Sequence, residues 1–377
     1  MKLFHLSDLH LGKRLKDFSL YEDHKYILKE ILTLINEEAP DAILVAGDVY
    51  DRNIPSEEAM KLWDDFLISL SKKGIPVYAI NGNHDSAIRF SDHGQLVEIA
   101  GIHLSPVYDG SVSKYTLEDD NGPVNIYLLP FIKPATVRPL FPDEEINDYT
   151  DALRVAIDHM DVEESQRNIL VAHQFVTGGS RCESEDIVVG GLDNVDASVF
   201  DSFDYVALGH LHGAQSIGRD TLRYCGTPIK YSLSERDHVK SITVVELREK
   251  GSVTVSEIPL KPRHDLRQIR GTYEELTTKK NYEGTDTDDY IHAVLTDEDD
   301  IVDAAGKLRV IYPNLMSLDY DNKRTRRTQS VTDVSEVEKK TPLELFSEFF
   351  EKRNNAPMTE EQKEYIIGCI ESIWEGK

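Results

Sequence analysis

The feature that most constrains the fold is a series of short apolar runs, most of them followed by a segment with helical periodicity. Six runs are predicted to be buried strands: Lys2–Leu6, Ala42–Ala46, Val77–Ile80, Val124–Leu129, Ile169–Ala172 and Tyr205–Leu208. The segment Ser56–Leu70 carries apolar side chains at spacings of three and four residues, and Tyr26–Ile35 has a similar stripe. Strands that alternate with helices predict a layered α/β domain.

The pattern changes around Pro259–Pro262, just after two further β-rich runs. These runs, Ser241–Leu247 and Val253–Ile258, predict the edge of a sheet. Residues 263–320 hold two or three short strand candidates with helical patterns between them, which predicts a second, smaller α/β domain. The candidates are Leu266–Arg270, Tyr290–Thr296 and Leu315–Asp319.

The C-terminal region has a polar linker and two short predicted helices. Residues 321–340 are polar and contain the basic run KRTRR at 323–327. Thr341-Pro-Leu-Glu344 and Thr359-Glu-Glu-Gln362 are capping boxes, the signature of a helix N-terminus. The apolar side chains that follow them are Leu343, Phe346, Phe349, Phe350, Ile366, Cys369, Ile370 and Ile373. Helices this short bury little surface alone, so they either pack on their own domain or dock another protein.

Charge and cysteine content narrow the possible classes of protein. With 42 basic and 68 acidic residues the formal net charge is −26, which is unlike a generic nucleic-acid binder. A DNA substrate would need positive charge from metal ions, a basic partner or a local patch. Cys182, Cys225 and Cys369 are widely spaced and form no zinc motif. The first residues lack the apolar run of a signal peptide, and no membrane-spanning stretch is found, so we expect a cytoplasmic protein.

Five polar segments occur at or just after predicted strand ends. They are Asp8-Leu-His10, Gly47-Asp48, Gly82-Asn83-His84-Asp85, His173 and Gly209-His210-Leu-His212. Each segment alone is a weak signal, because Gly-Asp and Gly-Asn are common turn pairs. Together they place the same ligand types at the edge of the sheet where α/β proteins form their sites. Residues i and i+2 of an extended chain point the same way, so we expect Asp8 and His10, and likewise His210 and His212, to face one point.

The donor set predicts a site for two divalent ions. Carboxylate, imidazole and amide donors without thiolates suit Mn²⁺ or Fe²⁺ better than a sulfur-rich zinc site. The seven candidate ligands are Asp8, His10, Asp48, Asn83, His173, His210 and His212. Seven are too many for one ion but fit two if one carboxylate bridges, and Asp48 is the natural bridge. Two ions roughly 3.5–4 Å apart can bind both oxygens of a phosphoryl group and generate hydroxide at neutral pH.

In this order, the five segments resemble the signature of the calcineurin-like metallophosphoesterases. More narrowly, the chain resembles the SbcD family, the nuclease subunits of bacterial SbcCD complexes. The resemblance rests on MKLFHLSDLHLGKRL, GDVYDRNIPSEEA, NGNHDSAIRF, ALGHLH and YCGTPIKYSLSE. The tail TPLELFSEFFEKRNNAPMTEEQKEYI resembles the family segment that binds the partner ATPase, SbcC. The likeness covers essentially the whole chain.

The resemblance implies an architecture. We expect an α/β metallophosphoesterase sandwich, with two β-sheets flanked by helices, a small α/β capping domain and a C-terminal helical tail. The expected divisions are a nuclease domain over 1–262, a capping domain over 263–322, a linker over 323–340 and an SbcC-binding tail over 341–377. It also implies a homodimer that forms through the nuclease domain, and no membrane.

The resemblance also implies an activity. We expect a metal-dependent DNA nuclease, with Mn²⁺ as the expected ion, that processes DNA ends and hairpins in replication, repair and recombination. It would be an ATP-dependent exonuclease on double strands and an endonuclease on single strands and hairpins. The chain has no GxxxxGK[ST] loop, so ATP dependence would come through SbcC.

Roles for individual residues follow from the resemblance alone. Asp8, His10, Asp48 and His212 would hold one ion, and Asp48, Asn83, His173 and His210 the other. His84 would be the catalytic residue that stabilises the transition state or protonates the leaving oxygen, and Asp85 would orient it. Archaeal and eukaryotic relatives carry a histidine linked to exonuclease action three residues after the bridging aspartate. Here that position is Asp51, as in many bacterial members.

Two other interpretations stay open at this point. One is a metallophosphoesterase that acts on small nucleotides or phosphoproteins, which the core motifs alone do not separate from a nuclease. The capping region and the aromatic tail argue against it, because a small-substrate enzyme has no evident use for a docking segment. The other is a scaffold that mainly assembles SbcC on DNA, against which the intact ligand set argues.

Overall fold

The computed structural model describes most of the chain. It covers residues 1–92, 94–185 and 193–323, residue 325, and in the C-terminal region residues 341, 343, 344, 346, 347, 350, 351 and 358–374. Almost all of the predicted linker and Phe349 lie outside the described residues. Within the part of the chain that the structure describes, no helix has the length and apolarity needed to cross a membrane.

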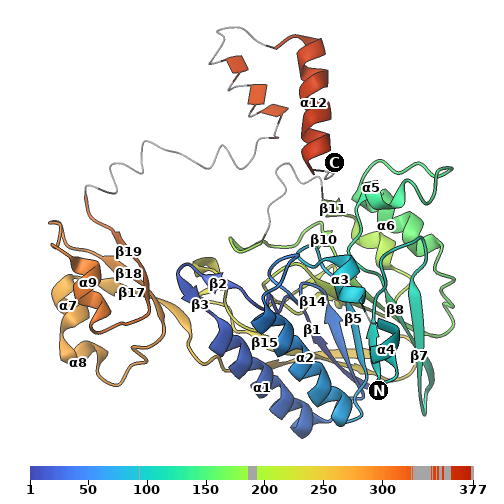
Figure 1. The fold of residues 1–377 in the computed structure, drawn as a ribbon, viewed down its shortest axis with the longest axis horizontal. Coiled ribbons are helices and arrows are strands. Elements are labelled where there is room, and N and C mark those ends of the chain that lie inside the picture. Colours follow the sequence, from blue (N-terminus) through green and yellow to red (C-terminus); the bar gives the residue numbers. More distant parts are fainter. Residues whose placement is uncertain are drawn as a thin grey trace.

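Two six-stranded sheets form the centre of the molecule (Figure 1). The first has the order β16-β15-β1-β4-β5-β6, with β1 (Lys2–Leu6), β4 (Ala42–Ala46), β5 (Val77–Ile80), β6 (Ile102–Leu104), β15 (Ser241–Leu247) and β16 (Val253–Pro259). The second has the order β13-β14-β12-β9-β8-β7, with β7 (Ser113–Asp119), β8 (Gly122–Leu128), β9 (Arg167–His173), β12 (Tyr205–Gly209), β13 (Gln215–Ile217) and β14 (Arg219–Tyr224). All eight strands predicted for this part of the chain are present, and β16 is an edge strand as predicted.

The sheets pack face to face and helices cover their outer faces. Alternate residues of the strands, such as Leu44 and Val171, fill the layer between the sheets. Helices α1 (Tyr21–Glu38) and α2 (Glu57–Lys72) cover the first sheet, and α5 (Pro134–Val137) and α6 (Tyr149–Asp158) cover the second. Short elements connect them: α3 (Ala87–Ser91), α4 (Gly94–Glu98), η1 (Ala197–Phe200), η2 (Leu233–Glu235), β2 (Arg14–Leu15), β3 (Phe18–Ser19), β10 (Phe175–Val176) and β11 (Asn194–Val195). The predicted sandwich is confirmed.

A small three-stranded unit follows the sandwich. Its parallel strands have the order β17-β18-β19, with β17 (Leu266–Gly271), β18 (Tyr290–Leu295) and β19 (Leu315–Tyr320). The helices α7 (Tyr273–Thr277), α8 (Lys279–Tyr282) and α9 (Ala304–Arg309) complete it. It has its own apolar core, which includes Ile291, Leu295 and Leu308. All three strand candidates of the sequence are therefore confirmed.

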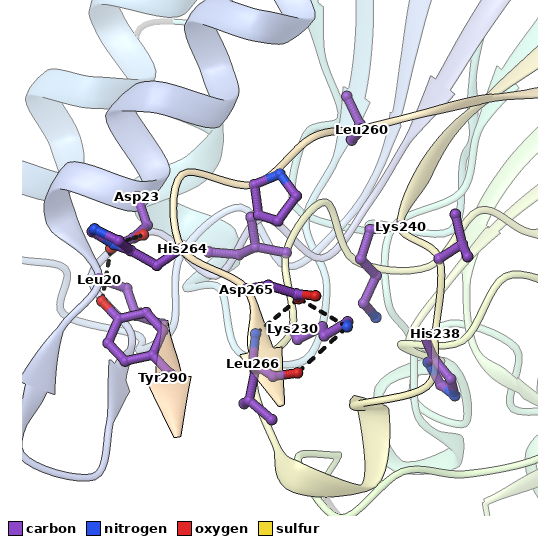
Figure 2. A pocket seen from close by; sticks show the side chains of 13 residues that line it. Leu20, Asp23, Lys230, His238, Lys240, Leu260, His264, Asp265, Leu266 and Tyr290 are labelled. Atoms are coloured by element: carbon purple, nitrogen blue, oxygen red, sulfur yellow. Dashed lines mark hydrogen bonds and ion pairs between the residues drawn. The ribbon is translucent and has the colours of Figure 1, made fainter. Parts of the chain in front are cut away.

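The small unit is attached to the sandwich through α1. Asp23 of α1 contacts His264 Nδ1 at 2.9 Å through one carboxylate oxygen and Tyr290 Oη at 2.8 Å through the other. Lys230 Nζ lies 2.8 Å from Asp265 Oδ1. Figure 2 shows these contacts around a cavity of about 180 Å³ at the junction. Tyr290 also packs into the apolar cluster beneath α1 and α2, so the junction buries both polar and apolar groups.

Both predicted capping boxes are present in the C-terminal region. The Thr341 and Thr359 hydroxyls accept from the backbone N–H groups of Glu344 and Gln362, whose side chains accept from the threonine N–H groups in return. The second box begins α12 (Glu360–Trp374). Phe346, Phe350, Met358, Tyr365 and Ile366 are among the side chains that line a shared apolar pocket.

Candidate metal centre

The predicted ligands lie at or just after the ends of β1, β4, β5, β9 and β12, and four of them have a backbone that is not extended. Asp8, His10 and Asp48 have φ values of 51°, 42° and 48°, and His210 has a φ of 104°. Asp8 and His10 do face one point as expected, but the reason is not the alternation of an extended strand. Left-handed conformations, which most side chains avoid, turn these side chains into the site. Such strain is common at functional sites, where the surrounding structure holds it.

Glycines allow the loops of the two sheets to approach closely. Gly47 has a φ of 87°, and a Cβ placed on it would lie 2.5 Å from Nδ1 of His173. A Cβ on Gly82 would overlap the carboxylate of Asp48. Only glycine fits at these two positions, because they bring the loops after β4 and β5 against each other and against β9.

Three side chains gather on one side of Asp48, and we call them the first half-site: Asp8, His10 and His212. His10 Nε2 lies 3.1 Å from His212 Nε2 and 4.0 Å from Asp8 Oδ1. It also lies 3.8 Å from Asp48 Oδ2. Donor atoms of Asp8, His10 and His212 are all close enough to one another to bind a single ion.

Three more side chains gather on the other side, and we call them the second half-site: Asn83, His173 and His210. Asn83 Oδ1 lies 2.9 Å from His173 Nε2 and 3.0 Å from His210 Nδ1. Asp48 Oδ2 lies 3.3 Å from His173 Nε2. The same carboxylate oxygen thus faces both half-sites. The two histidines after β12 lie in different half-sites, so they do not face one point as expected.

His84 lies at the edge of this arrangement. Its Nε2 is 3.9 Å from Asp48 Oδ2, and its Nδ1 is 3.1 Å from the backbone carbonyl of Asp51. Its side chain is 18% exposed, whereas the predicted ligands other than Asn83 are buried. The Asp85 carboxylate accepts from the backbone N–H groups of Val49, Tyr50 and Gly82. Asp85 therefore organises the loop after β4, and the Asp51 carbonyl contacts the His84 ring. An orienting role of Asp85 toward His84 stays a prediction.

Burial and mutual charge set the protonation states of the site. Burial lowers the pKa values of His10, His210 and His212, so these imidazoles are neutral and can offer lone pairs to a metal. Burial raises the pKa of Asp8 to about 7. Burial opposes ionisation of Asp48 too, but the adjacent histidines, with His173 contributing most, together offset it and lower the pKa of Asp48.

Residues that the sequence did not single out support His212. Ser184 Oγ lies 2.7 Å from His212 Nδ1 and 2.5 Å from Glu235 Oε1. Glu185 Oε1 accepts from the His212 backbone N–H at 2.6 Å, and Lys240 Nζ donates to the His212 carbonyl at 2.9 Å. These contacts join segments far apart in the chain, so the sequence did not reveal them, although Glu235 is the last residue of the segment YCGTPIKYSLSE.

The residues present fit a divalent metal. The six charged or imidazole ligands are each at most 8% exposed, and they combine oxygen and nitrogen donors without sulfur. Such a cluster of buried, facing donors is costly to maintain unless cations or protons satisfy it. The grouped donors Asp8–His10–His212, His10–Asp48–His84 and Asp8–Asp48–His173 each have the spacing of a metal site.

Comparison with known proteins places the chain in a family. The family model for calcineurin-like phosphoesterases matches residues 1–214, and the model described as the Type 5 capsule protein repressor C-terminal domain matches residues 262–354. The chain is 30% identical to the SbcD subunit of the SbcCD nuclease from Staphylococcus epidermidis, over 99% of both chains. It is 35% identical to the protein of the same name from Staphylococcus saprophyticus, over 84% of both. A dimetal phosphatase structure from Danio rerio aligns at 12% identity with a TM-score of 0.43, covering 69% of this chain and 96% of that chain.

The relatives and the site agree. The matched segment 1–214 contains all the predicted ligands and His84, and the relative at 30% identity extends over nearly the full chain. The chain therefore belongs to the calcineurin-like phosphoesterases and, within them, to the SbcD family, which makes it a phosphodiester hydrolase that uses divalent metal.

Proposed function

We propose that this protein is a DNA nuclease with a two-metal site, the catalytic subunit of a complex that processes DNA ends and hairpins in replication, repair and recombination. The nuclease activity is supported by the relatives, both named as the SbcD subunit of the SbcCD nuclease. The activities proposed are an exonuclease on double strands, dependent on ATP through the partner, and an endonuclease on single strands and hairpins. The net charge of −26 means that bound cations and the partner must favour the approach of DNA.

The position of Asp48 carries the two-metal part of the proposal. Its Oδ2 lies 3.8 Å from His10 Nε2 in the first half-site and 3.3 Å from His173 Nε2 in the second. One carboxylate between two sets of imidazoles is an arrangement that suits a pair of divalent ions. Asp8, His10, Asp48 and His212 would hold one ion, and Asp48, Asn83, His173 and His210 the other, with Mn²⁺ the expected metal.

The protein's own residues would orient the substrate and handle the leaving group. When bound, the divalent ions supply the Lewis acidity that phosphodiester hydrolysis needs. The Nδ1–H of His84 donates to the Asp51 carbonyl, so Nε2 is the nitrogen that faces the site and can reach a substrate oxygen. From this position His84 would stabilise the charge of the transition state or protonate the departing sugar oxygen.

We further propose that the C-terminal segment 341–377 binds SbcC and that the sandwich, residues 1–262, forms a homodimer. The pocket lined by Phe346, Phe350 and Met358 offers an apolar surface for a partner. The three-stranded unit, within the proposed capping domain 263–322, would help to position DNA. A cytoplasmic location is part of the same proposal, because none of the three cysteines, all of which the structure describes, forms a disulfide.

The first test uses the purified chain with Mn²⁺, end-labelled linear DNA and a small phosphomonoester, each with and without a chelator. We expect DNA to be degraded only when metal is present and the monoester to react poorly. Faster turnover of the monoester than of DNA would favour the alternative of a small-nucleotide or phosphoprotein phosphoesterase. Reaction of neither substrate, with or without SbcC, would contradict the nuclease proposal and favour a scaffold.

A further inference from the structure

The two half-sites are supported by different kinds of group. In the second half-site, His173 Nδ1 donates to the backbone carbonyl of Ala46 over 2.8 Å. In the first, His212 Nδ1 contacts the hydroxyl of Ser184, and that hydroxyl contacts the carboxylate of Glu235. A backbone carbonyl is present whatever the residue, whereas a hydroxyl and a carboxylate depend on the side chains at two particular positions.

Glu235 is the centre of a buried polar cluster. It has no exposed surface, and its Oε2 lies 2.6 Å from Nζ of Lys240. Its Oε1 contacts Ser184 at 2.5 Å and Ser232 at 3.0 Å, and accepts from the Tyr231 N–H at 3.2 Å. With an ammonium in direct contact and several donors around it, the carboxylate is ionised and acts only as an acceptor.

The direction of each hydrogen bond follows from this. Because Glu235 only accepts, the Ser184 hydroxyl donates its single proton to Oε1. The Ser184 oxygen must then accept in its 2.7 Å contact with His212, so the proton of neutral His212 is on Nδ1. Nε2 is left with a lone pair, and it is this atom that lies 3.1 Å from His10 Nε2 in the first half-site.

We propose that Ser184 and Glu235 are positioning residues that fix the tautomer and ring orientation of His212, so that its Nε2 lone pair faces the first half-site. Partners of this kind orient a ligand histidine and raise its basicity. Lys240 contacts the carboxylate of Glu235 in turn. Its side chain also lines the cavity at the junction with the three-stranded unit (Figure 2). The inference rests on the proposed metal role of His212.

The test is calorimetric titration of Mn²⁺ into the metal-free full-length chain. We expect Ser184→Ala and Glu235→Gln each to weaken one Mn²⁺ site by roughly 10- to 100-fold. Ser184→Thr keeps the hydroxyl and should restore the wild-type affinity. Ser232→Ala is the matched control, because it also removes a hydroxyl from Glu235 but does not touch His212. It should bind Mn²⁺ as the wild type does.

The outcomes separate this inference from the proposed function. His212→Ala must weaken Mn²⁺ binding; if it does not, the metal role of His212 fails and the proposed function with it. If His212→Ala weakens binding but Ser184→Ala and Glu235→Gln do not, the metal site stands and the positioning role is overturned. Equal weakening by Ser184→Ala and Ser232→Ala would also overturn it, because general disturbance of Glu235 would then be the cause. Urea unfolding of each metal-free variant checks that it is folded.

Discussion

The side chains of the two half-sites are held in place by different kinds of group. In the second half-site, the contacts of Asn83 with His173 and His210 and the carbonyl of Ala46 come from groups at the ends of central strands. In the first, His212 depends on Ser184 and Glu235, which lie in connecting segments. The comparison indicates that strand ends determine where the predicted ligands lie. Side chains in connecting segments then determine the tautomer and ring orientation of one of them, His212.

The largest loss of Mn²⁺ binding and DNA cleavage is expected from substitution of Asp48, which lies between the two half-sites. Asp48→Asn keeps the shape of the side chain but removes the charge that faces both half-sites. We expect it to lower Mn²⁺ binding at both half-sites and to reduce DNA cleavage by more than about 100-fold. His212→Ala is the control, because among the candidate metal groups His212 occurs only in the first half-site. Mn²⁺ titration distinguishes the outcomes: an Asp48→Asn protein that keeps as many sites as His212→Ala would show that the carboxylate is not shared.

His84 belongs to neither half-site, so its substitution should impair DNA cleavage without impairing Mn²⁺ binding. We expect His84→Gln to bind Mn²⁺ as the wild type does and to lose cleavage by roughly 10²- to 10⁴-fold, because the group acting on the leaving oxygen is gone. Rates on end-labelled DNA and Mn²⁺ titration are measured on the same preparation. Loss of metal with residual cleavage would instead place His84 among the ligands.

A buried histidine beneath the first half-site should make the stability of the metal-free protein depend on pH. Burial lowers the pKa of His24 to about 3, and its Nε2 contacts Tyr231, whose hydroxyl donates to the Leu9 carbonyl between Asp8 and His10. Below the unfolded pKa of 6.5 the unfolded chain binds a proton that the folded chain does not. The contribution of neutral His24 to the free energy of unfolding is therefore complete above pH 6.5. It is lost as pH falls, by at most about 1.4 kcal/mol per pH unit.

The measurement is urea unfolding in chelator between pH 7 and pH 5, for the wild type and for His24→Gln. Glutamine removes the titrating group, so the variant's stability should fall less steeply with decreasing pH. The buried His5, whose pKa is also lowered to about 3 by burial, remains and leaves a residual slope in both proteins. Parallel curves for the two proteins would show that His24 contributes nothing.

Substitutions in the C-terminal region are expected to have the smallest effect on metal-dependent cleavage. Phe346 is 37% exposed and lines the apolar pocket there. Phe346→Glu should weaken SbcC binding by about tenfold, the cost of removing a central aromatic contact, and leave Mn²⁺-dependent cleavage of a small diester unchanged. Val310→Glu, at an 85% exposed site on the three-stranded unit, is the control. Impaired diester cleavage by Phe346→Glu would show that the region belongs to the catalytic fold. Phe349→Glu, in the same predicted helix, is expected to behave in the same way.

Sequence patterns predicted the strands well, because a strand depends largely on the chemistry of its own residues. They also predicted that polar side chains at several strand ends lie close together, as they do, and the role of these side chains as metal ligands stays a prediction. β1, β4, β5 and β15 have the bounds that apolar runs indicated, since strands covered on both faces are largely apolar. The reason given for the pairing of Asp8 with His10 was wrong, because left-handed backbone at a loop is a property of tertiary packing. Ser184 and Glu235 were missed for the same reason: they are 51 residues apart and only folding brings them to His212.

The central claim is that one carboxylate joins two ions, and anomalous diffraction at the manganese edge from crystals grown with Mn²⁺ tests it most directly. A shared Asp48 predicts two peaks on either side of its carboxylate, separated by roughly 3.5–4 Å, one beside His10 and His212 and the other beside His173 and His210. A single peak, or two peaks of which only one contacts Asp48, would contradict it.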